Sequence, residues 1–329
     1  LKRIFQSPGP VYDPEGYGID WWRTARAFYA AGFRKGEIVH NSFSYHLTPA
    51  GVMLETGAAK IGCAVVPAGV GNTKLQLQSI SDIRPAGFAG TPSFLKILIE
   101  KALELNIDIS SLSKSLVGGE ALTPKLRLEI ENAGINCQQI YASADLGCIA
   151  YESVSKDGLI VDEGLYVEIV RPGTNNPAAD GDVGEVVVTS FCPEYPLIRF
   201  GTGDLSAIMP GESSCGRTNT RLRGWMGRAD QTTKVKGMFV HPKQIQSVTL
   251  LNPEIIKSQL TVERKNDTDL MTLVCEVENY IELSQNSNYI KKIVDNIKSI
   301  CKLRGEVKLI APGSLPNNGK VIDDLRDYT

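Results

Sequence analysis

Short apolar runs alternate with stretches of helical periodicity along the first half of the chain. Apolar residues recur at helical spacing over 48–61 and 91–105, which predicts two helices. Apolar runs at 63–68, 86–89 and 114–117 predict buried strands, and a glycine-containing turn follows each of them. A strand, a turn and a helix repeated in this order are typical of an α/β domain with a parallel sheet and helices on both faces.

The pattern changes in the second half of the chain, where apolar and polar residues alternate. Alternation over 164–170 and 184–190 predicts an antiparallel β meander that ends the large domain. Further strands and a helix predicted over 290–301 form a small α+β unit of about a hundred residues. We therefore expect a large α/β domain over residues 1–228 and a small C-terminal domain over residues 229–329.

The segment 21–31 is predicted to be the first helix. Its apolar residues keep helical spacing, and Gly32 follows as a C-terminal stop. We assign Trp21, Trp22 and Phe28 to the core rather than to a substrate pocket.

Composition and charge narrow the class of protein. The 329 residues are 42% hydrophobic and 22% charged with a formal net charge of −2, which is typical of a globular protein and argues against a nucleic-acid-binding surface. No apolar run approaches the roughly 20 residues of a membrane span, and residues 1–12 lack the apolar region of a signal peptide. Seven cysteines without a C-x-x-C pair indicate reduced thiols in a cytoplasmic protein, without a zinc site or a disulfide framework.

Two glycine-flanked polar turns between 195 and 242 carry the strongest candidate chemistry. The first turn follows a strand-like piece at 196–200, and the second surrounds another at 233–235. A carboxylate in such a turn can accept hydrogen bonds from a vicinal diol, and a guanidinium suits a phosphate. Either turn alone is more typical of an ordinary connection between strands, but the two in this order favour nucleotide binding at a domain junction. Their polar residues are Thr202, Asp204, Arg228, Asp230, Lys234 and Lys236.

These two turns also resemble a known family. RFGTGDL at 199–205, followed by GRADQTTKVKGMFVHPKQI at 227–245, is similar to motifs of the adenylate-forming acyl-CoA synthetases, and most of all to the phenylacetate-CoA ligase branch. The resemblance covers nearly the whole chain. It implies an ATP-dependent carboxylic acid:CoA ligase that forms an acyl-adenylate and releases pyrophosphate and AMP. ATP/AMP, Mg²⁺ and coenzyme A would be its cofactors.

The resemblance also implies a set of nucleotide-binding residues. Gly118-Gly119-Glu120 is similar to the turn that lines the adenine, and YASAD at 141–145 is similar to the family's Y-G-x-[ST]-E. Asp145 takes the position of the carboxylate that helps to hold magnesium. Ala144 stands at the hydroxyl position, so either Ser143 supplies the hydroxyl from a shifted turn or phosphate contact is weakened. The nucleotide-binding residues implied are Gly119, Glu120, Tyr141, Ala142, Ser143, Asp204 for the ribose, and Arg228.

The phosphate loop and the start of the chain depart from the family pattern. Ser7 and Gly9 remain of the expected loop, but Pro8 and Pro10 each remove a backbone donor. An ordinary Pro-Gly turn is about as consistent with these residues as a working phosphate loop. Relatives carry a further segment before this loop, so we expect an N-terminal segment to be missing and the chain to be a fragment or a truncated gene product.

The acyl pocket is implied by resemblance alone. Tyr45 and His46 lie in the turn that borders this pocket in the family. A single histidine after a strand is more often structural, so we do not expect His46 to act in catalysis.

Motion of the small domain follows from the same resemblance. Asp230 matches the family's hinge, and Lys320 matches the lysine that contacts the acyl carboxylate and the phosphate during adenylation. Rotation of this mobile domain would then bring Lys236 and Gly237 to the CoA side. Taken locally, the N-G-K turn before the C-terminus is more typical of a solvated hairpin.

Two alternatives stay open beside the CoA ligase. One is a degenerate AMP-binding protein without catalysis, and the other is an adenylating enzyme with a non-CoA acceptor. As partners we expect a small-molecule carboxylic acid and CoA, with no nucleic acid and no membrane, and we leave a homodimer open. The sequence does not identify the acid.

Overall fold

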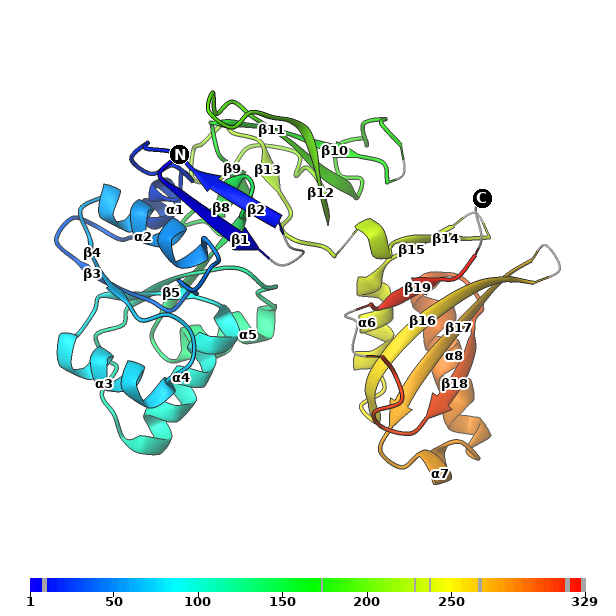
Figure 1. Ribbon diagram of the computed structural model, residues 1–329. Helices are drawn as coiled ribbons and strands as arrows, with labels where there is room; N and C mark the ends of the chain where they lie inside the picture. Colours follow the sequence, from blue (N-terminus) through cyan, green and yellow to red (C-terminus); the bar gives the residue numbers. More distant parts are fainter. Residues whose placement is uncertain are drawn as a thin grey trace. The chain divides into compact units, whose positions relative to one another are not determined.

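The computed structural model describes residues 1–7, 11–172, 174–227, 229–236, 238–265, 268–316 and 320–326 (Figure 1). Its backbone contacts divide the chain into two compact units. The first unit comprises Leu1–Val170, Pro177–Thr202 and Ser206–Trp225. The second comprises Arg171–Asn176, Gly203–Leu205 and Met226–Thr329.

An eight-stranded sheet forms the centre of the first unit, in the order β13-β9-β8-β7-β6-β5-β3-β4. The strands from β4 to β7 are parallel, and β7, β8, β9 and β13 continue the sheet antiparallel. The parallel sheet predicted from the alternating pattern is therefore present. The strands are β3 (Ile38–Asn41), β4 (Ala64–Pro67), β5 (Gly87–Gly90), β6 (Lys114–Val117), β7 (Asn136–Ser143), β8 (Gly147–Glu152), β9 (Leu159–Val161) and β13 (Arg221–Leu222).

Helices cover both faces of this sheet. Neighbouring residues of a strand point to opposite faces, so each strand contributes side chains to two cores. Phe88 packs into a core with Leu77 and Leu95, whereas the adjacent Ala89 belongs to a separate core with Phe28 and Met53. Figure 1 shows α3, α4 and α5 gathered on one side and α1 and α2 on the other. The helices are α1 (Ala25–Ala30), α2 (Ala50–Lys60), α3 (Thr73–Ile83), α4 (Pro92–Leu105) and α5 (Pro124–Asn132).

The first helix is shorter than predicted. It begins at Ala25 rather than at residue 21, because Arg23 has a φ of +59°. The Asp20 carboxylate accepts hydrogen bonds from the backbone N–H groups of Thr24 (2.8 Å) and Ala25 (3.1 Å) and so occupies the free donors at the start of the helix. Trp22 is nevertheless buried in the core, as predicted.

A three-stranded sheet, β10-β11-β12, adds a second β layer to the first unit. Its β12 runs unbroken through 197–206, so the predicted turn around Thr202 and Asp204 is wrong. Gly203 takes a positive φ of +70° within the strand, and the Thr202 hydroxyl donates to the Val186 carbonyl oxygen (2.8 Å). The strands are β10 (Leu165–Val170), β11 (Gly184–Ser190) and β12 (Leu197–Ser206), and an antiparallel hairpin of β1 (Arg3–Ser7) and β2 (Val11–Glu15) precedes α1.

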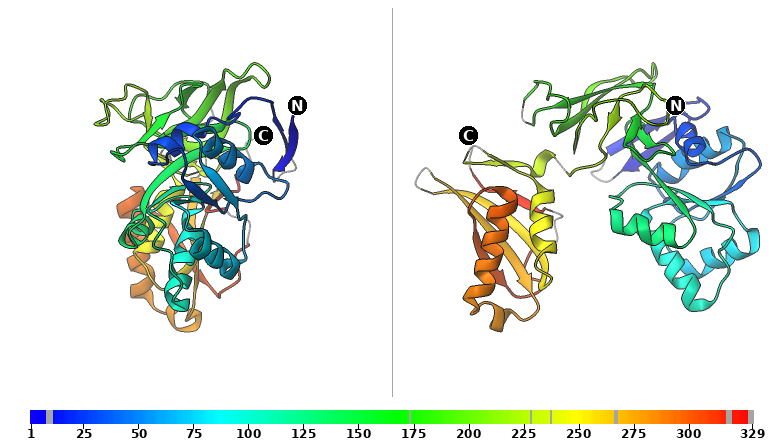
Figure 2. Two further views of the ribbon diagram at one scale, coloured as in Figure 1. Left: turned by 90° about the vertical axis from the view of Figure 1, so that its left-hand side faces the viewer. Right: turned by 180° about the vertical axis from the view of Figure 1, so that it is seen from behind.

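The second unit has its own core and its own four-stranded sheet, in the order β18-β17-β16-β19. Helices α6 and α8 pack side by side against this sheet (Figure 2). In the part of the chain that the structure describes, no helix has the length and apolar content of a membrane span. The elements are the 3₁₀ helix η1 (Ala229–Gln231), β14 (Thr233–Val235), β15 (Met238–Val240), α6 (Pro242–Leu250), β16 (Ile255–Lys265), β17 (Thr268–Val277), α7 (Tyr280–Leu283), α8 (Ser287–Cys301), β18 (Glu306–Ile310) and β19 (Ile322–Asp324).

Candidate nucleotide and acyl site

A cavity of about 220 Å³ lies at the carboxyl ends of β3, β6 and β7 in the first unit. Ligands of open α/β sheets bind at this edge, because loops and helix N-termini converge there. The structure brings four predicted site residues to this cavity, namely Ser7, Gly119, Ala142 and Ser143. The other residues that line it are Phe43, Thr48, Pro49, Ala50, Met53, Leu54, Gly118, Ile140 and Ala144.

The glycine pair after β6 lets the backbone approach β7 closely. A Cβ on Gly118 would lie 2.8 Å from the carbonyl oxygen of Ile140, which is closer than real Cβ atoms come. Gly119 has a φ of +78°, a conformation that L side chains rarely adopt. The next residue, Glu120, is exposed and accepts a hydrogen bond from the backbone N–H of Ser93 (2.6 Å) at the start of α4.

Tyr141 and Thr202 meet between β7 and β12. The Tyr141 hydroxyl donates to Thr202 Oγ1 at 3.4 Å, and both residues belong to the first unit. Asp204 lies two residues farther along β12 and is half-buried, but it groups with the second unit. Arg228, which the sequence places in the same nucleotide site, lies outside the described residues.

The strand β7 continues to Ser143, so the first three residues of the YASAD motif at 141–145 belong to the strand. The Ser143 hydroxyl oxygen accepts a hydrogen bond from the backbone N–H of Leu146 (3.2 Å), and Ser143 and Ala144 both line the cavity. The Ser143 O–H therefore remains a donor at the cavity wall, beside an alanine that offers none. Asp145 follows directly in the same turn.

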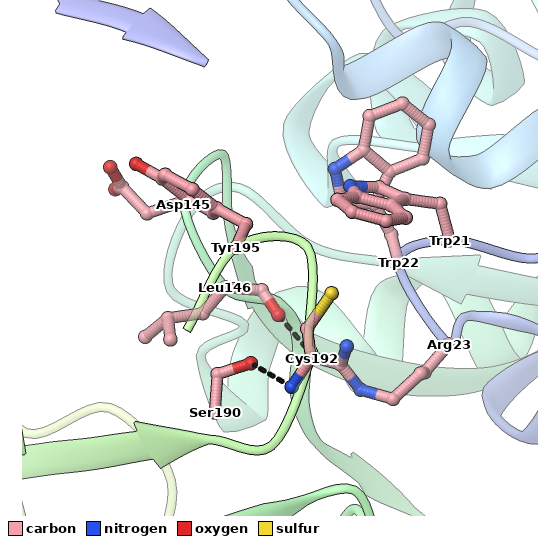
Figure 3. Close-up of a pocket in the computed structure, with 8 residues that line it drawn as sticks. All are labelled: Trp21, Trp22, Arg23, Asp145, Leu146, Ser190, Cys192 and Tyr195. Carbon is pink, nitrogen blue, oxygen red and sulfur yellow. Dashed lines mark hydrogen bonds between the residues drawn. The ribbon is translucent and has the colours of Figure 1, made fainter. Parts of the chain in front are cut away.

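Asp145 faces a second, much smaller pocket of about 10 Å³, close to the volume of one water. Figure 3 shows its carboxyl group beside the Tyr195 side chain, across the pocket from Trp21 and Trp22. The Arg23 guanidinium donates to the Leu146 carbonyl oxygen at the base of this pocket. Burial raises the pKa of the Asp145 carboxyl, and the neighbouring Asp13 carboxylate raises it further.

The predicted acyl-pocket residues do not line the 220 Å³ cavity. The Tyr45 hydroxyl accepts a hydrogen bond from Asn41 Nδ2 (2.8 Å). Burial raises the pKa of this hydroxyl, and a hydrogen bond with Glu55 and the charge of that carboxylate raise it further. His46 is exposed, and its backbone N–H donates to Ser44 Oγ (3.3 Å). Sequence reasoning passed over Phe43, which immediately precedes these residues and does line the cavity.

Lys320 lies in the second unit, just before β19. Its ammonium group forms an ion pair with Asp323 (2.8 Å), and 53% of its side chain is exposed. The next backbone N–H, that of Val321, donates to Gln231 Oε1 (2.7 Å) in η1. The residue after the predicted hinge is therefore bonded, within this unit, to the segment that carries Lys320.

The other predicted residues of the second unit are only partly described. Lys236 is exposed with a φ of +48°, and its backbone N–H donates to Asp269 Oδ2 (3.1 Å). Asp230 is part of η1, but its side chain lies outside what the structure describes, as do Gly237 and, in the phosphate loop, Gly9.

Comparison with known protein families matches two separate segments of the chain. The model of the AMP-binding enzyme family matches residues 25–192, and the model of the AMP-binding enzyme C-terminal domain matches residues 237–327. The chain belongs to the AMP-binding enzyme family. The first match contains the strands β3 to β7 that shape the 220 Å³ cavity, and the second contains Lys320.

Curated relatives place this AMP-binding enzyme in the phenylacetate-CoA ligase branch. The phenylacetate-coenzyme A ligase of Escherichia coli is 32% identical over an alignment that covers 99% of this chain and 79% of the relative. The phenylacetate-coenzyme A ligase of Thermus thermophilus is 31% identical, over an alignment that covers 92% of this chain and 74% of the relative.

A solved structure shares the fold of this AMP-binding enzyme. The chain matches a 2-hydroxyisobutyryl-CoA ligase, crystallised in an open conformation with 2-HIB-AMP and CoA, with a TM-score of 0.81. The match covers 98% of this chain and 75% of the ligase at 22% identity. Both proteins therefore have the fold of adenylate-forming enzymes.

Proposed function

We propose that this chain is an ATP-dependent carboxylic acid:CoA ligase of the phenylacetate-CoA ligase type. The observation that carries the proposal is that both parts of the chain match AMP-binding enzyme models, with ligase relatives aligned over nearly all of it. The acid's carboxylate attacks the α-phosphorus of ATP to form an acyl-adenylate and release pyrophosphate. The thiol of CoA then attacks the acyl carbon, forming the thioester and releasing AMP.

The acid is proposed to enter the 220 Å³ cavity. Phe43, Pro49, Met53, Leu54 and Ile140 give this cavity a largely apolar wall, which suits an aryl or aliphatic acid. Ser7 and Ser143 supply hydroxyls at the same cavity, where a carboxylate or phosphate oxygen needs donors. Tyr45 and His46 remain predictions for the acyl pocket.

The nucleotide is proposed to bind along the loops after β6 and β7 and along β12. Gly119, Glu120 and Ala142 would border the adenine, and Tyr141 would stack on it. Asp204 would accept hydrogen bonds from the ribose hydroxyls, and Arg228 would contact a phosphate or ribose oxygen. The Tyr141–Thr202 hydrogen bond supports the part of this arrangement that lies in the first unit, because it ties β7 to the β12 residue Thr202.

Asp145 and Lys320 are proposed to handle charge in the adenylation step. When bound, Mg²⁺ neutralises negative charge on the phosphate oxygens as a Lewis acid. Asp145 offers that cation a carboxylate oxygen, a ligand type that Mg²⁺ prefers. Lys320 would exchange its exposed ion pair with Asp323 for the reacting carboxylate and phosphate, since such pairs contribute little stability.

Rotation about Asp230 is proposed to separate the two half-reactions. Lys320 would serve adenylation, and Lys236 with Gly237 would border the CoA thiol's entry afterwards. The hydrogen bond between Gln231 and the Val321 backbone supports this, because it makes η1 and the segment with Lys320 move together.

Pyrophosphate release tests the proposal. We would measure it with ATP, Mg²⁺ and a panel of aryl and short-chain acids, comparing the wild type with Lys320→Ala. Acid-dependent release should fall by about 10²-fold or more in the variant, because a charge contact to the transition state is lost. Lys292→Ala, at an exposed position on α8, is the control and should leave release unchanged.

The same assay separates the alternatives. AMP release that does not require CoA would indicate another acceptor. AMP binding without pyrophosphate release from any acid would indicate a degenerate nucleotide-binding protein. Ala144 at the cavity wall is the observation that favours this second candidate, because the family has a hydroxyl there.

Location and assembly are proposed separately. The seven free cysteines support a cytoplasmic location, where thiols stay reduced. A homodimer remains a prediction, which light scattering of the purified chain would check.

A further inference from the structure

Arg326 is a buried arginine in the second unit. Only 3% of its side chain is exposed, whereas Arg264 and Arg304 of the same unit are exposed. An arginine keeps its charge in a protein, so its burial costs free energy that its contacts must offset. The groups that surround it therefore indicate its role.

Three polar side chains surround the Arg326 guanidinium. Its Nε and Nη2 donate to the two carboxylate oxygens of Asp324 (2.8 and 2.6 Å) in a bidentate pair. Nη2 also donates to Thr233 Oγ1 (2.8 Å) on β14. Nη1 forms an ion pair with Asp269 Oδ2 (2.9 Å) on β17. The guanidinium thus joins β14 and β17 to the end of β19.

The contact with Asp269 extends to the turn of the β14–β15 hairpin (Figure 1). Lys236 is the first residue of this turn, and its backbone N–H donates to Asp269 Oδ2 (3.1 Å). The same oxygen contacts Arg326. The hydrogen bond from Lys236 lowers the pKa of the Asp269 carboxyl, and Arg326 lowers it further, so the carboxylate stays charged at neutral pH.

The backbone of Lys236 needs such support. Its φ of +48° lies in the left-handed region, which is unfavourable for a residue with a Cβ. A glycine would adopt this conformation without that cost, so the geometry of the turn does not explain the lysine. Its side chain is exposed. A strained residue that surrounding contacts hold in place is typical of a functional site.

Stability alone explains this buried cluster poorly. Apolar side chains of similar volume often stabilise a fold as well as a buried ion pair does. What an ion pair adds is direction, because its hydrogen bonds fix the groups that it contacts. Here the fixed group is the Asp269 carboxylate, which holds the backbone of an exposed turn.

We propose that Arg326 is a positioning residue for the CoA half-reaction. Through Asp269 it fixes the turn at Lys236 in the conformation that meets CoA. This inference rests on the proposed function, in which Lys236 and Gly237 border the entry of the CoA thiol. Adenylation does not use this turn in that scheme, so loss of the Arg326–Asp269 pair should impair the use of CoA and spare adenylation.

Separate measurement of the two half-reactions tests this inference. Pyrophosphate released in a single turnover without CoA reports adenylation, and the rate of thioester formation at increasing CoA gives the KM for CoA. We expect Arg326→Gln and Asp269→Ala each to raise this KM by ~10-fold or more, because a displaced contact residue weakens productive binding. Single-turnover pyrophosphate release should keep the wild-type rate in both variants.

Two further variants sharpen the comparison. Arg304→Gln is the matched control, because it removes an exposed arginine of the same unit, and it should change neither half-reaction. If Arg326 acts through Asp269, the double variant should raise the KM for CoA no more than the stronger single variant does. Effects of the two single variants that multiply in the double variant would reject this coupling.

Exchange of the Lys236 amide proton gives a readout that does not depend on activity. In NMR spectra of the ¹⁵N-lysine-labelled chain, this amide should exchange ~10-fold faster in Arg326→Gln, because the carboxylate that holds it is no longer fixed. The amide of Lys292 on α8 should keep its wild-type rate. Unchanged exchange at Lys236, or an unchanged KM for CoA, would overturn the proposal.

A merely structural role would give a different result. If Arg326 only stabilised the second unit, Arg326→Gln would lower the melting temperature and slow both half-reactions to the same extent, which also overturns the proposal. Asp269→Ala keeps the test valid if Arg326→Gln fails to fold, because it leaves the pair between Arg326 and Asp324 in place.

The outcome is separable from that of the proposed function. Acid-dependent pyrophosphate release by the wild type, together with an unchanged KM for CoA in both variants, would retain the ligase and reject the positioning role. A wild type that releases no pyrophosphate with any acid would reject the ligase, and the role of Arg326 in the CoA step would fall with it.

Discussion

At the scale of single residues, a few neighbouring atoms set the pKa of each cysteine thiol. Cys215 is half-buried, and the hydroxyl of Ser213 donates to its sulfur at 3.1 Å. This hydrogen bond is the main cause that lowers the pKa of the Cys215 thiol to about 7. Burial opposes the shift, and further hydrogen bonds with Ser153, the Arg217 backbone and Ser155 add to it. Burial raises the pKa of Cys63, Cys137, Cys148, Cys275 and Cys301 instead.

Cys215 should therefore react first with iodoacetamide. The thiolate is the reactive form, so alkylation should rise as the pH passes through about 7, below the range of an ordinary thiol. Mass spectrometry of tryptic peptides after short exposures across a pH series would locate the modified cysteine. Ser213→Ala should move the midpoint to higher pH, and an unchanged midpoint would refute the role given to Ser213.

At the scale of elements, the position of the loop after β6 depends on how closely its backbone approaches the backbone of β7. Gly118 lies where any Cβ would collide with the Ile140 carbonyl oxygen of β7, and this contact sets the position of the next residue, Gly119, at the cavity. The two strands are paired in parallel, so a shift at Gly118 is passed to both walls of the cavity.

Gly118→Ala should lower the free energy of unfolding by about 1–3 kcal/mol, because an extra methyl overpacks a close contact. Urea denaturation followed by circular dichroism would measure it, and calorimetry should show weaker AMP binding. Gly18→Ala is the control, since a Cβ there would lie 3.9 Å from the Trp21 ring and its φ is ordinary. Equal stability of the two variants would contradict the collision.

At the scale of the whole molecule, each unit is stabilised by cores of its own. The second unit gathers residues of α6, α8 and its four-stranded sheet, including the fully buried Ile293 and Ile297, into one cluster. The clusters under the eight-stranded sheet draw on the first unit alone.

Ile293→Ala should therefore destabilise the second unit by about 2–5 kcal/mol through the cavity that it leaves. Hydrogen exchange should accelerate for the amides of β16 and β17 while those of β5 and β6 keep their wild-type rates. Lys292→Ala, exposed on the same helix, should change neither set. Equal acceleration in both units would show that they unfold together.

The sequence by itself determined the order of elements and the family. Apolar periodicity is local, so it predicted α2, α4 and the strands β4 to β6 within a few residues, and the motifs over 199–205 and 227–245 sufficed for the resemblance. Apolar periodicity could not predict that Asp20 and Arg23 delay α1, because a polar side chain and a positive φ set the start of that helix. Nor could it predict that β12 continues through Thr202, whose hydroxyl donates to the carbonyl oxygen of Val186 on another strand.

Only the tertiary structure decided which side chains share a pocket. Ser7, Phe43, Gly119 and Ser143 come from separate strands and loops, and their common cavity depends on the order of strands in the sheet. Sequence specifies the residue types, but which side chains share a cavity is a property of the packed fold, because it depends on contacts between residues that are far apart in the chain.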